Sequence, residues 1–372
     1  MRGFDASTAF HISWSSRDNA NAWVEPTTVC QLKCPFCFRG VGAKGYCPAH
    51  RPLEEVKHEI ETLRKMRNIE CVSLAGGEPL LYPQLLDVVR HCHKLRLKVR
   101  ICSNGLALTA HRLKELRNAG TNEILIHLDR HQGVYTLDAM KKNRERYCKM
   151  FREIKGVNLG FMAMIRGFDK EELDDLTQFY KENVDVIRLA SFIFTKDSLN
   201  PITIGKPRTA DYTKLINYLN ETYSSKPCAY ISKKFTKDVP SWLIYMPIFA
   251  DKEFAGYVDD KIYRLSANAY RIVNGRYWFL TDENTATFPR LLPLCFNKQI
   301  RTVVKNFIAH ARKNSFRSRM HYQILTVNCG PDLLSKGWDL CTACPDAMLH
   351  NGKLVPSCLY ERIKKGEEIV VP

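Results

Sequence analysis

The chain has 372 residues, and its 56 Lys and Arg against 39 Asp and Glu give a formal net charge of +17. With 45% hydrophobic and 26% charged residues, the composition is that of a globular protein and excludes a wholly disordered or collagen-like chain. No apolar run reaches the roughly 18 residues of a membrane span, and residues 1–16 lack the apolar core of a secretory signal. We therefore expect a cytoplasmic protein.

From about residue 20 to 225, short β-rich runs alternate with longer helical ones. The first strand covers 24–28, and Pro52 opens the first helix, because proline suits the first helical position. The strands expected next are 71–75, 98–102, 123–128, 157–165 and 184–190, and the helices are 83–95, 109–119, 137–154, 169–180 and 211–223.

Six strands that alternate with helices predict a parallel sheet with right-handed crossovers, either an open doubly wound sheet or a partial barrel. In both folds the ligand site lies at the C-terminal ends of the strands. Polar and glycine-containing segments lie at the ends of four of the expected strands: a loop with three cysteines after the first strand, and the segments 76–79, 103–105 and 127–129. This arrangement predicts a site at that end of the sheet.

The segment 226–325 is rich in Tyr, Phe, Trp and Lys and has no clear periodicity. One exception is an expected helix at about 298–313, which combines an apolar stripe with basic residues. The stripe packs on the core in one interpretation. In the other, the basic helix meets an anionic substrate or the surface of a membrane.

The chain contains 14 cysteines. A disulfide framework is not expected in a reducing compartment, so grouped cysteines indicate metal or redox chemistry. The remaining, scattered cysteines are expected to be small buried apolar residues. The grouped cysteines are Cys30, Cys34 and Cys37 near the N-terminus, and Cys329, Cys341, Cys344 and Cys358 near the C-terminus.

The first group offers three thiolates within eight residues, and soft thiolates select iron–sulfur clusters, zinc or copper(I). A structural zinc ion needs four protein ligands, and Cys47 would have to supply the fourth. Three cysteines around a four-iron cluster instead leave one iron free. A catalytic cluster needs such an open position.

The spacing Cys30-x3-Cys34-x2-Cys37, with Phe36 before the third cysteine, resembles the signature of the radical S-adenosylmethionine (radical SAM) superfamily. The resemblance implies that the three cysteines hold a catalytic 4Fe–4S cluster and that residues 20–225 fold as a partial (β/α)6 TIM-like barrel. It also implies that one electron, from a donor such as flavodoxin or ferredoxin, cleaves SAM to a 5′-deoxyadenosyl radical, which abstracts hydrogen from a substrate.

Two further segments resemble SAM-binding elements of this superfamily. Residues 76–79 match its GGEP motif, which binds the amino group of the cofactor, and residues 103–105 match an element near the cofactor's ribose and carboxylate. Asp129, at the end of the next strand, is assigned to the same site. No catalytic residue that returns or removes hydrogen is assigned. The expected cofactor-binding residues are Phe36, Gly76, Gly77, Glu78, Pro79, Ser103, Asn104 and Asp129.

The spacing Cys341-x2-Cys344-x13-Cys358 resembles the C-terminal motif of the molybdenum-cofactor cyclisation enzyme, a radical SAM protein with a twitch or SPASM-like extension. The resemblance implies a second, auxiliary 4Fe–4S cluster, for which Cys329 is the candidate fourth ligand. That family has basic residues, which hold its nucleotide, where this chain has Asp346 and Met348. We therefore do not carry over its GTP substrate. A zinc ribbon is the alternative interpretation.

These observations predict an α/β fold with a small C-terminal auxiliary-cluster domain. The expected parts are an N-terminal extension (1–19), the radical SAM core (20–225), a bridging aromatic and basic region (226–325) and the auxiliary iron–sulfur domain (326–372).

Two classes of function remain open from the sequence. The first is a radical SAM enzyme acting on an unidentified substrate, with anionic molecules, lipids, sugars or nucleotides of secondary metabolism, and peptides as candidates. The second is a basic zinc-containing nucleic-acid-binding protein, which the sequence pI of 9.3 favours. No recognised nucleic-acid module appears, so nucleic acid is not an expected partner. An iron–sulfur enzyme is brown and a zinc protein colourless, which distinguishes the two.

Overall fold

A computed structural model of the chain describes residues 4–35, 37–43, 45–132, 136–194, 209–236, 239–280 and 294–372. Ten strands form one sheet in the order β1-β8-β9-β13-β7-β6-β5-β4-β3-β2. Strands β2 to β7 are all parallel to their neighbours, as the alternation of strands and helices predicts. These six are β2 (Asn21–Thr27), β3 (Cys71–Gly76), β4 (Lys98–Ser103), β5 (Glu123–His127), β6 (Asn158–Ile165) and β7 (Ile187–Phe194).

Helices connect these strands, and their bounds agree with the sequence expectations to within a few residues. Side-chain caps explain where three of them begin: Thr109, Thr136 and Asp169 each accept a hydrogen bond from the backbone N–H three residues further on. The helices are α1 (Leu53–Arg67), α2 (Leu85–Lys94), α3 (Ala110–Ala119), α4 (Leu137–Glu153), α5 (Lys170–Glu182) and α6 (Thr209–Thr222).

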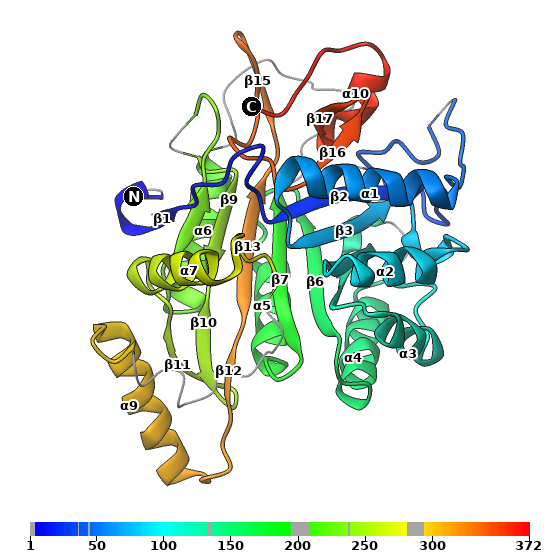
Figure 1. Cartoon of the computed structure of the whole chain (residues 1–372). Coiled ribbons are helices and arrows are strands. Elements are labelled where there is room, and N and C mark those ends of the chain that lie inside the picture. Colours follow the sequence, from blue (N-terminus) through cyan, green and yellow to red (C-terminus); the bar gives the residue numbers. More distant parts are fainter. Residues whose placement is uncertain are drawn as a thin grey trace.

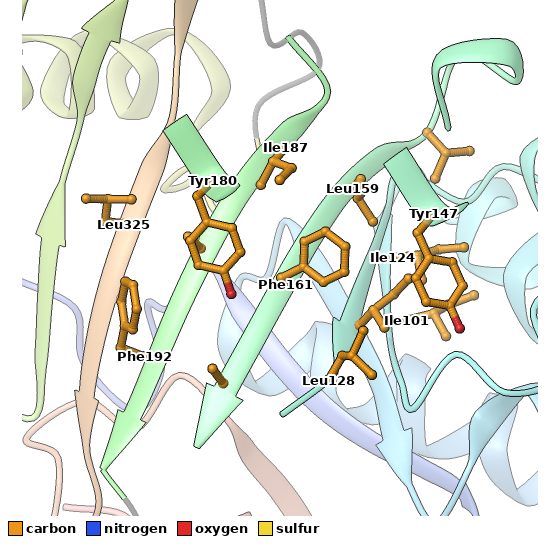
Figure 2. Close-up of a cluster of buried hydrophobic side chains, with 14 of the residues drawn as sticks. Ile101, Ile124, Leu128, Tyr147, Leu159, Phe161, Tyr180, Ile187, Phe192 and Leu325 are labelled. Atoms are coloured by element: carbon orange, nitrogen blue, oxygen red, sulfur yellow. The ribbon is translucent and has the colours of Figure 1, made fainter. Parts of the chain in front are cut away.

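The sheet has an apolar face against these helices and a second face that lines a cavity. Along β4, Val99 and Ile101 belong to the hydrophobic core, whereas Arg100 and Cys102 line the cavity, because successive residues of a strand point to opposite faces. Figure 2 shows the apolar face, where aromatic rings from strands and helices meet. The rings of Phe161 and Tyr180 stack there with centroids 6.1 Å apart.

The segment without a sequence assignment adds strands to the sheet. Strand β13 pairs in parallel with β7 and antiparallel with β9, which in turn pairs with β8. The large sheet therefore takes strands from more than one of the four parts expected from the sequence. The division of the chain into these four parts stays a prediction. The additional strands are β1 (Phe10–His11), β8 (Ala229–Ile231), β9 (Trp242–Tyr245) and β13 (Ile324–Cys329).

The basic helix α9 (Lys298–Lys313) packs on a second, three-stranded sheet. Ile300 and Val303 are buried, and Phe307 packs against the small apolar cluster beneath the helix. The apolar stripe therefore contacts the protein, and peripheral contact of the basic face with a membrane stays a prediction. This region contains β10 (Pro247–Ala250), β11 (Glu253–Tyr257), α7 (Asp260–Asn274) and β12 (Met320–Tyr322). Among the helices of the described ranges, none has the length and apolar character required to span a membrane.

The C-terminal part contains two hairpins and a short helix. The second hairpin contacts the edge strand β2, and Figure 1 shows it in red beside that strand. Asn351 and Gly352 both adopt left-handed backbone conformations at its tip, with φ of 48° and 74°, which suits a tight hairpin turn. The elements are β14 (Asp332–Leu334), β15 (Gly337–Asp339), β16 (Ala347–His350), β17 (Lys353–Pro356) and α10 (Tyr360–Lys364).

Candidate functional site

Both cysteine groups line one cavity of about 370 Å³ on the inner face of the sheet. The sequence separates these groups by about three hundred residues, and its motifs alone do not place them together. The cavity-lining cysteines include all seven predicted ligands: Cys30, Cys34, Cys37, Cys329, Cys341, Cys344 and Cys358.

The first cysteine loop follows the end of β2. The backbone N–H of Cys37 donates to the carbonyl of Cys34 at 3.1 Å, and that of Leu32 donates to the Cys30 sulfur at 3.4 Å. Burial, together with the nearby charges of Cys37 and Cys30, raises the pKa of Cys34 to about 12. The three thiols therefore lie within electrostatic reach of one another. A cationic iron centre is the kind of partner that stabilises them as thiolates, so this donor set fits an iron–sulfur cluster.

The glycine pair after β3 is fastened to this loop by backbone hydrogen bonds. The N–H of Gly77 donates to the Thr27 carbonyl at 2.9 Å, and the N–H of Glu78 donates to the Val29 carbonyl at 2.7 Å. A Cβ atom on Gly77 would lie 2.3 Å from the Val29 oxygen. The absence of a side chain is therefore what lets the two loops meet.

We expect Gly77→Val to weaken SAM binding at least tenfold while the iron content is retained, because the added side chain forces the two loops apart. Equilibrium dialysis of the anaerobically reconstituted protein with SAM, alongside an iron assay, tests this. Gly167→Val is the matched control, since a Cβ there meets nothing within 4 Å. If iron is lost in proportion to SAM binding, the glycine pair shapes the cluster site instead.

Glu78 holds the next loop rather than facing the cavity. Its side chain is buried, and its two oxygens accept hydrogen bonds from the Ser103 hydroxyl and the Asn104 backbone N–H, both at 2.7 Å. The Asn104 side-chain nitrogen lies 3.8 Å from the Cys30 sulfur. Of the residues expected to bind the cofactor, Gly76, Gly77, Ser103, Asn104 and Asp129 line the cavity. Pro79 is buried behind it and Phe36 lies outside the described residues.

Asp129 lies at the cavity wall beside the first cysteine loop. It is almost fully buried, and its Oδ2 atom is 2.7 Å from His127 Nε2 and accepts a hydrogen bond from the Met164 N–H at 2.8 Å. Its charge contributes to the raised pKa of Cys34. The structure therefore brings the end of β5 against the cysteine loop, as expected from parallel strands.

The second cysteine group lies in a segment that closes the open side of the sheet. Near β8, the N–H of Thr342 donates to the Ser232 carbonyl at 3.0 Å. Near β2, Arg67 donates to the Cys344 carbonyl at 2.7 Å, and Asn21 donates to the Pro345 carbonyl at 3.3 Å. Residues 341–346 therefore reach from the β8 side of the sheet to its opposite edge.

The thiols of the second group also lie close together. A hydrogen bond between Cys341 and Cys344 lowers the pKa of Cys341 and raises that of Cys344 well above its ordinary value. Burial raises the pKa of Cys358, and the charge of Cys341 raises it further. Cys344 is buried and Cys341 and Cys358 are half-buried, and three such thiols on one cavity wall are a donor set that fits a second iron–sulfur cluster.

Cys329, at the end of β13, has a buried lysine as its neighbour. Lys233 Nζ lies 3.7 Å from the Cys329 sulfur and 2.6 Å from Asp332 Oδ2, and the Lys233 backbone pairs with Cys341. Burial acts to lower the pKa of Lys233, but the charges of Cys329 and Asp332 outweigh it and raise that pKa. Cys329 therefore adjoins the second group, and its role as a fourth ligand stays a prediction.

Arg39 is a site residue that the sequence did not indicate. It is 2% exposed, forms an ion pair with Glu25 of β2, and lies 3.6 Å from Glu361. Its guanidinium covers the ring of Tyr360, 4.6 Å from the centroid. Arg39 thus links the loop of the first cysteine group to the segment that follows Cys358. A single arginine after the third cysteine belongs to no spacing or periodicity that would predict its contacts. The contact with the segment after Cys358 is therefore seen only in the folded structure.

Arg39→Met is expected to destabilise the protein by about 3–5 kcal/mol, because it leaves the buried Glu25 carboxylate without its cationic partner. Urea unfolding measures the change. The double variant Arg39→Met, Glu25→Gln should recover a substantial part of the loss. Arg90→Met is the control, because Arg90 and its partner Asp87 are both exposed. Equal destabilisation by the single and double variants would contradict the assigned pairing.

Comparison with known proteins agrees with this geometry. Residues 24–180 match the model of the Radical SAM superfamily. The chain therefore contains a radical SAM domain, the domain that holds a 4Fe–4S cluster and SAM in a class of enzymes. The interpretation as a zinc-containing nucleic-acid binder is not favoured.

Curated relatives include radical SAM enzymes of different activities. The 7,8-dihydro-6-hydroxymethylpterin dimethyltransferase of Methanocaldococcus jannaschii is 23% identical over 92% of this chain and 77% of that protein. The GTP 3′,8-cyclase of Aquifex aeolicus is 26% identical over 54% of this chain and 64% of that protein. A solved structure, SuiB of Streptococcus suis bound to the precursor peptide SuiA, is 19% identical with a TM-score of 0.43, and the match covers 57% of this chain and 47% of SuiB.

Proposed function

We propose that the protein cleaves SAM reductively and uses the resulting 5′-deoxyadenosyl radical to remove a hydrogen atom from a substrate held in the same cavity. One observation carries this proposal. The three cysteines of the first loop line a single cavity together with the glycine pair after β3 and the Ser103–Asn104 turn after β4. Motif residues from three successive strand ends therefore converge on one space.

The chain's own groups have separable tasks in this proposal. Cys30, Cys34 and Cys37 hold the cluster, which when bound supplies the electron that breaks the sulfur–carbon bond of SAM. The absence of side chains at Gly76 and Gly77 lets this turn pack against the backbone that leads into the cysteine loop, so that the turn lines the cavity beside the three cysteines. Glu78 fixes the Ser103–Asn104 turn through two hydrogen bonds, which positions the Asn104 side chain beside Cys30.

We propose a second, auxiliary 4Fe–4S cluster on Cys341, Cys344 and Cys358. Its support is the proximity of the three thiols and their position on the wall of the same cavity. If Cys329 is a fourth ligand, the auxiliary cluster is closed and serves as an electron relay or a structural element. If it is not, one iron is open towards the substrate.

The product that the protein forms from its substrate will identify the reaction subclass. An electron donor such as flavodoxin or ferredoxin is the proposed reductant. The relative that aligns over most of the chain carries the name of a dimethyltransferase, so methyl transfer from SAM is one outcome to score. Lipids, sugars, nucleotides and peptides are the substrate classes to screen.

Iron and sulfide analysis combined with an anaerobic SAM-cleavage assay tests the proposal. The reconstituted protein is reduced with dithionite, and 5′-deoxyadenosine is quantified by chromatography with and without candidate substrates. We expect a brown protein that forms 5′-deoxyadenosine only when it is reduced. A colourless zinc protein, or an iron protein that leaves SAM intact under reduction, contradicts the proposed function.

A further inference from the structure

One end of the cavity is lined by aromatic side chains. Trp14, Tyr263, Trp278 and Phe279 contribute to it, and we call these four residues the aromatic floor. The rings of Tyr263 and Trp278 meet edge to face with centroids 5.6 Å apart, and those of Trp14 and Phe279 lie 6.3 Å apart. Aromatic groups packed in this way bind further planar rings by stacking and edge contacts.

Hydrogen bonds fix Leu280, which directly follows Phe279 of the aromatic floor, at the N-terminal ends of β3 and β4. Glu70, directly before β3, accepts a hydrogen bond from the Leu280 N–H at 3.2 Å. Lys98, the first residue of β4, donates to the Leu280 carbonyl at 2.7 Å. The glycine pair and the cysteine loop adjoin the other end of β3, and a strand of this length spans roughly 20 Å. The aromatic floor and the SAM site therefore lie at opposite ends of the cavity.

Two charged groups near the aromatic floor, Arg100 and Glu123, are paired with each other. Arg100 Nε lies 2.5 Å from Glu123 Oε1, and the Phe279 ring covers the Arg100 guanidinium at 4.5 Å from its centroid. A polyanion that entered this region would lose its water without gaining an uncommitted cation. Within the described part of the chain, the charged Arg, Asp and Glu side chains of the wall balance: Arg39, Arg100 and Arg188 against Glu123, Asp129 and Asp346.

We propose that the substrate bound between the aromatic floor and the SAM site is an uncharged, largely apolar molecule that presents a planar ring. This inference rests on the proposed function and specifies its substrate class. It replaces the anionic substrate that the net charge of the chain suggests, because the excess basic residues lie outside the cavity wall. The floor supplies ring contacts, and the Arg100–Glu123 pair supplies polar edges without net charge.

A fluorescent probe tests the inference without turnover. Nile red, an uncharged planar dye, is titrated into the anaerobically reconstituted protein with SAM present. We expect saturable binding that Trp278→Ala and Trp278→Leu weaken roughly tenfold, whereas Trp278→Phe, which keeps a ring, stays within about threefold. Trp338→Ala is the matched control, because Trp338 lies in β15 and does not line the cavity, and it should leave the affinity unchanged. Uncharged 2-naphthol should displace the dye and GTP should not.

Two results would overturn the inference: displacement of Nile red by GTP at concentrations similar to those of 2-naphthol, or equal affinities for the Trp278→Leu and Trp338→Ala variants. Thermal unfolding of each variant is compared first, and the competition between 2-naphthol and GTP in the wild-type protein decides the inference if the smaller side chains prevent folding. Failure of the proposed function appears separately, as an absence of 5′-deoxyadenosine in the reduced wild-type protein, and leaves the dye measurements valid.

Discussion

Cys34→Ala is expected to abolish SAM cleavage, lowering 5′-deoxyadenosine formation by more than about 100-fold, beyond the 10- to 100-fold typical of losing an outer-shell partner of a metal ligand. The reason is geometric: Cys34 lies between Cys30 and Cys37 on a loop that lines the cavity, and no other cysteine belongs to this loop's motif. The loop is not part of the sheet, so the free energy of unfolding of the metal-free protein should change by no more than about 1 kcal/mol.

Anaerobic SAM cleavage under dithionite measures this effect, and iron analysis should show that one cluster is lost. Cys47→Ala is the control, because Cys47 is exposed and does not line the cavity. It should retain both iron and cleavage. Retained cleavage in the Cys34→Ala protein would refute the assignment of the catalytic cluster, and lost cleavage in Cys47→Ala would indicate that the motif extends further than proposed.

Removing Cys341 and Cys344 together should halve the iron content, from about eight to about four atoms per chain, if both sites hold complete 4Fe–4S clusters. These two thiols are hydrogen-bonded to each other and line the same cavity wall as Cys358. Their removal leaves Cys358 as the one remaining thiol of the motif, and one thiol cannot hold a cluster. The first cysteine loop follows a different strand, and SAM cleavage without substrate should persist. Iron and sulfide analysis with electron paramagnetic resonance spectroscopy of the reduced protein measures both effects.

Cys295→Ala is the control for this pair, since Cys295 does not line the cavity. Zinc in place of iron at the second group, or an unchanged iron content in the double variant, would contradict the auxiliary cluster.

Cys329→Ala distinguishes the two forms of the auxiliary site. If Cys329 is the fourth ligand, its removal changes the spectrum of the auxiliary cluster or makes the cluster labile. If iron content, spectrum and turnover are unchanged, Cys329 is not a ligand, its sulfur keeps Lys233 as a neighbour, and the open-iron form stands.

The parallel half of the sheet could be predicted because its signals are local. Each strand from β2 to β7 is a short apolar run followed by a helix with its own cap or periodicity, so windows of about ten residues suffice. Strand β13 could not be predicted in this way, because its partner β7 precedes it by more than a hundred residues: Asn328 pairs with Ile193 and, on the other side, with Trp242. Strands β8 and β9 are also too short for periodicity to reveal.

The residues of the candidate site also fall into two groups: those with a local sequence pattern and those brought together only by folding. The cysteine motifs and the glycine pair have characteristic spacings, so the sequence indicated them directly. The contact of Arg39 with Tyr360 and Glu361, and the aromatic floor built from Trp14 and Trp278, depend on segments that meet only in the folded chain. No local sequence pattern predicts these contacts between distant segments.

The segment 341–346 determines whether one side of the cavity is closed. It joins the β8 side of the sheet to the β2 edge, yet it follows all ten sheet strands in the chain. A chain that ended before residue 341 would therefore contain every strand of the large sheet and still lack the segment that closes this side of the cavity. The hydrogen bonds of this segment at both edges of the sheet thus separate that side of the cavity from solvent.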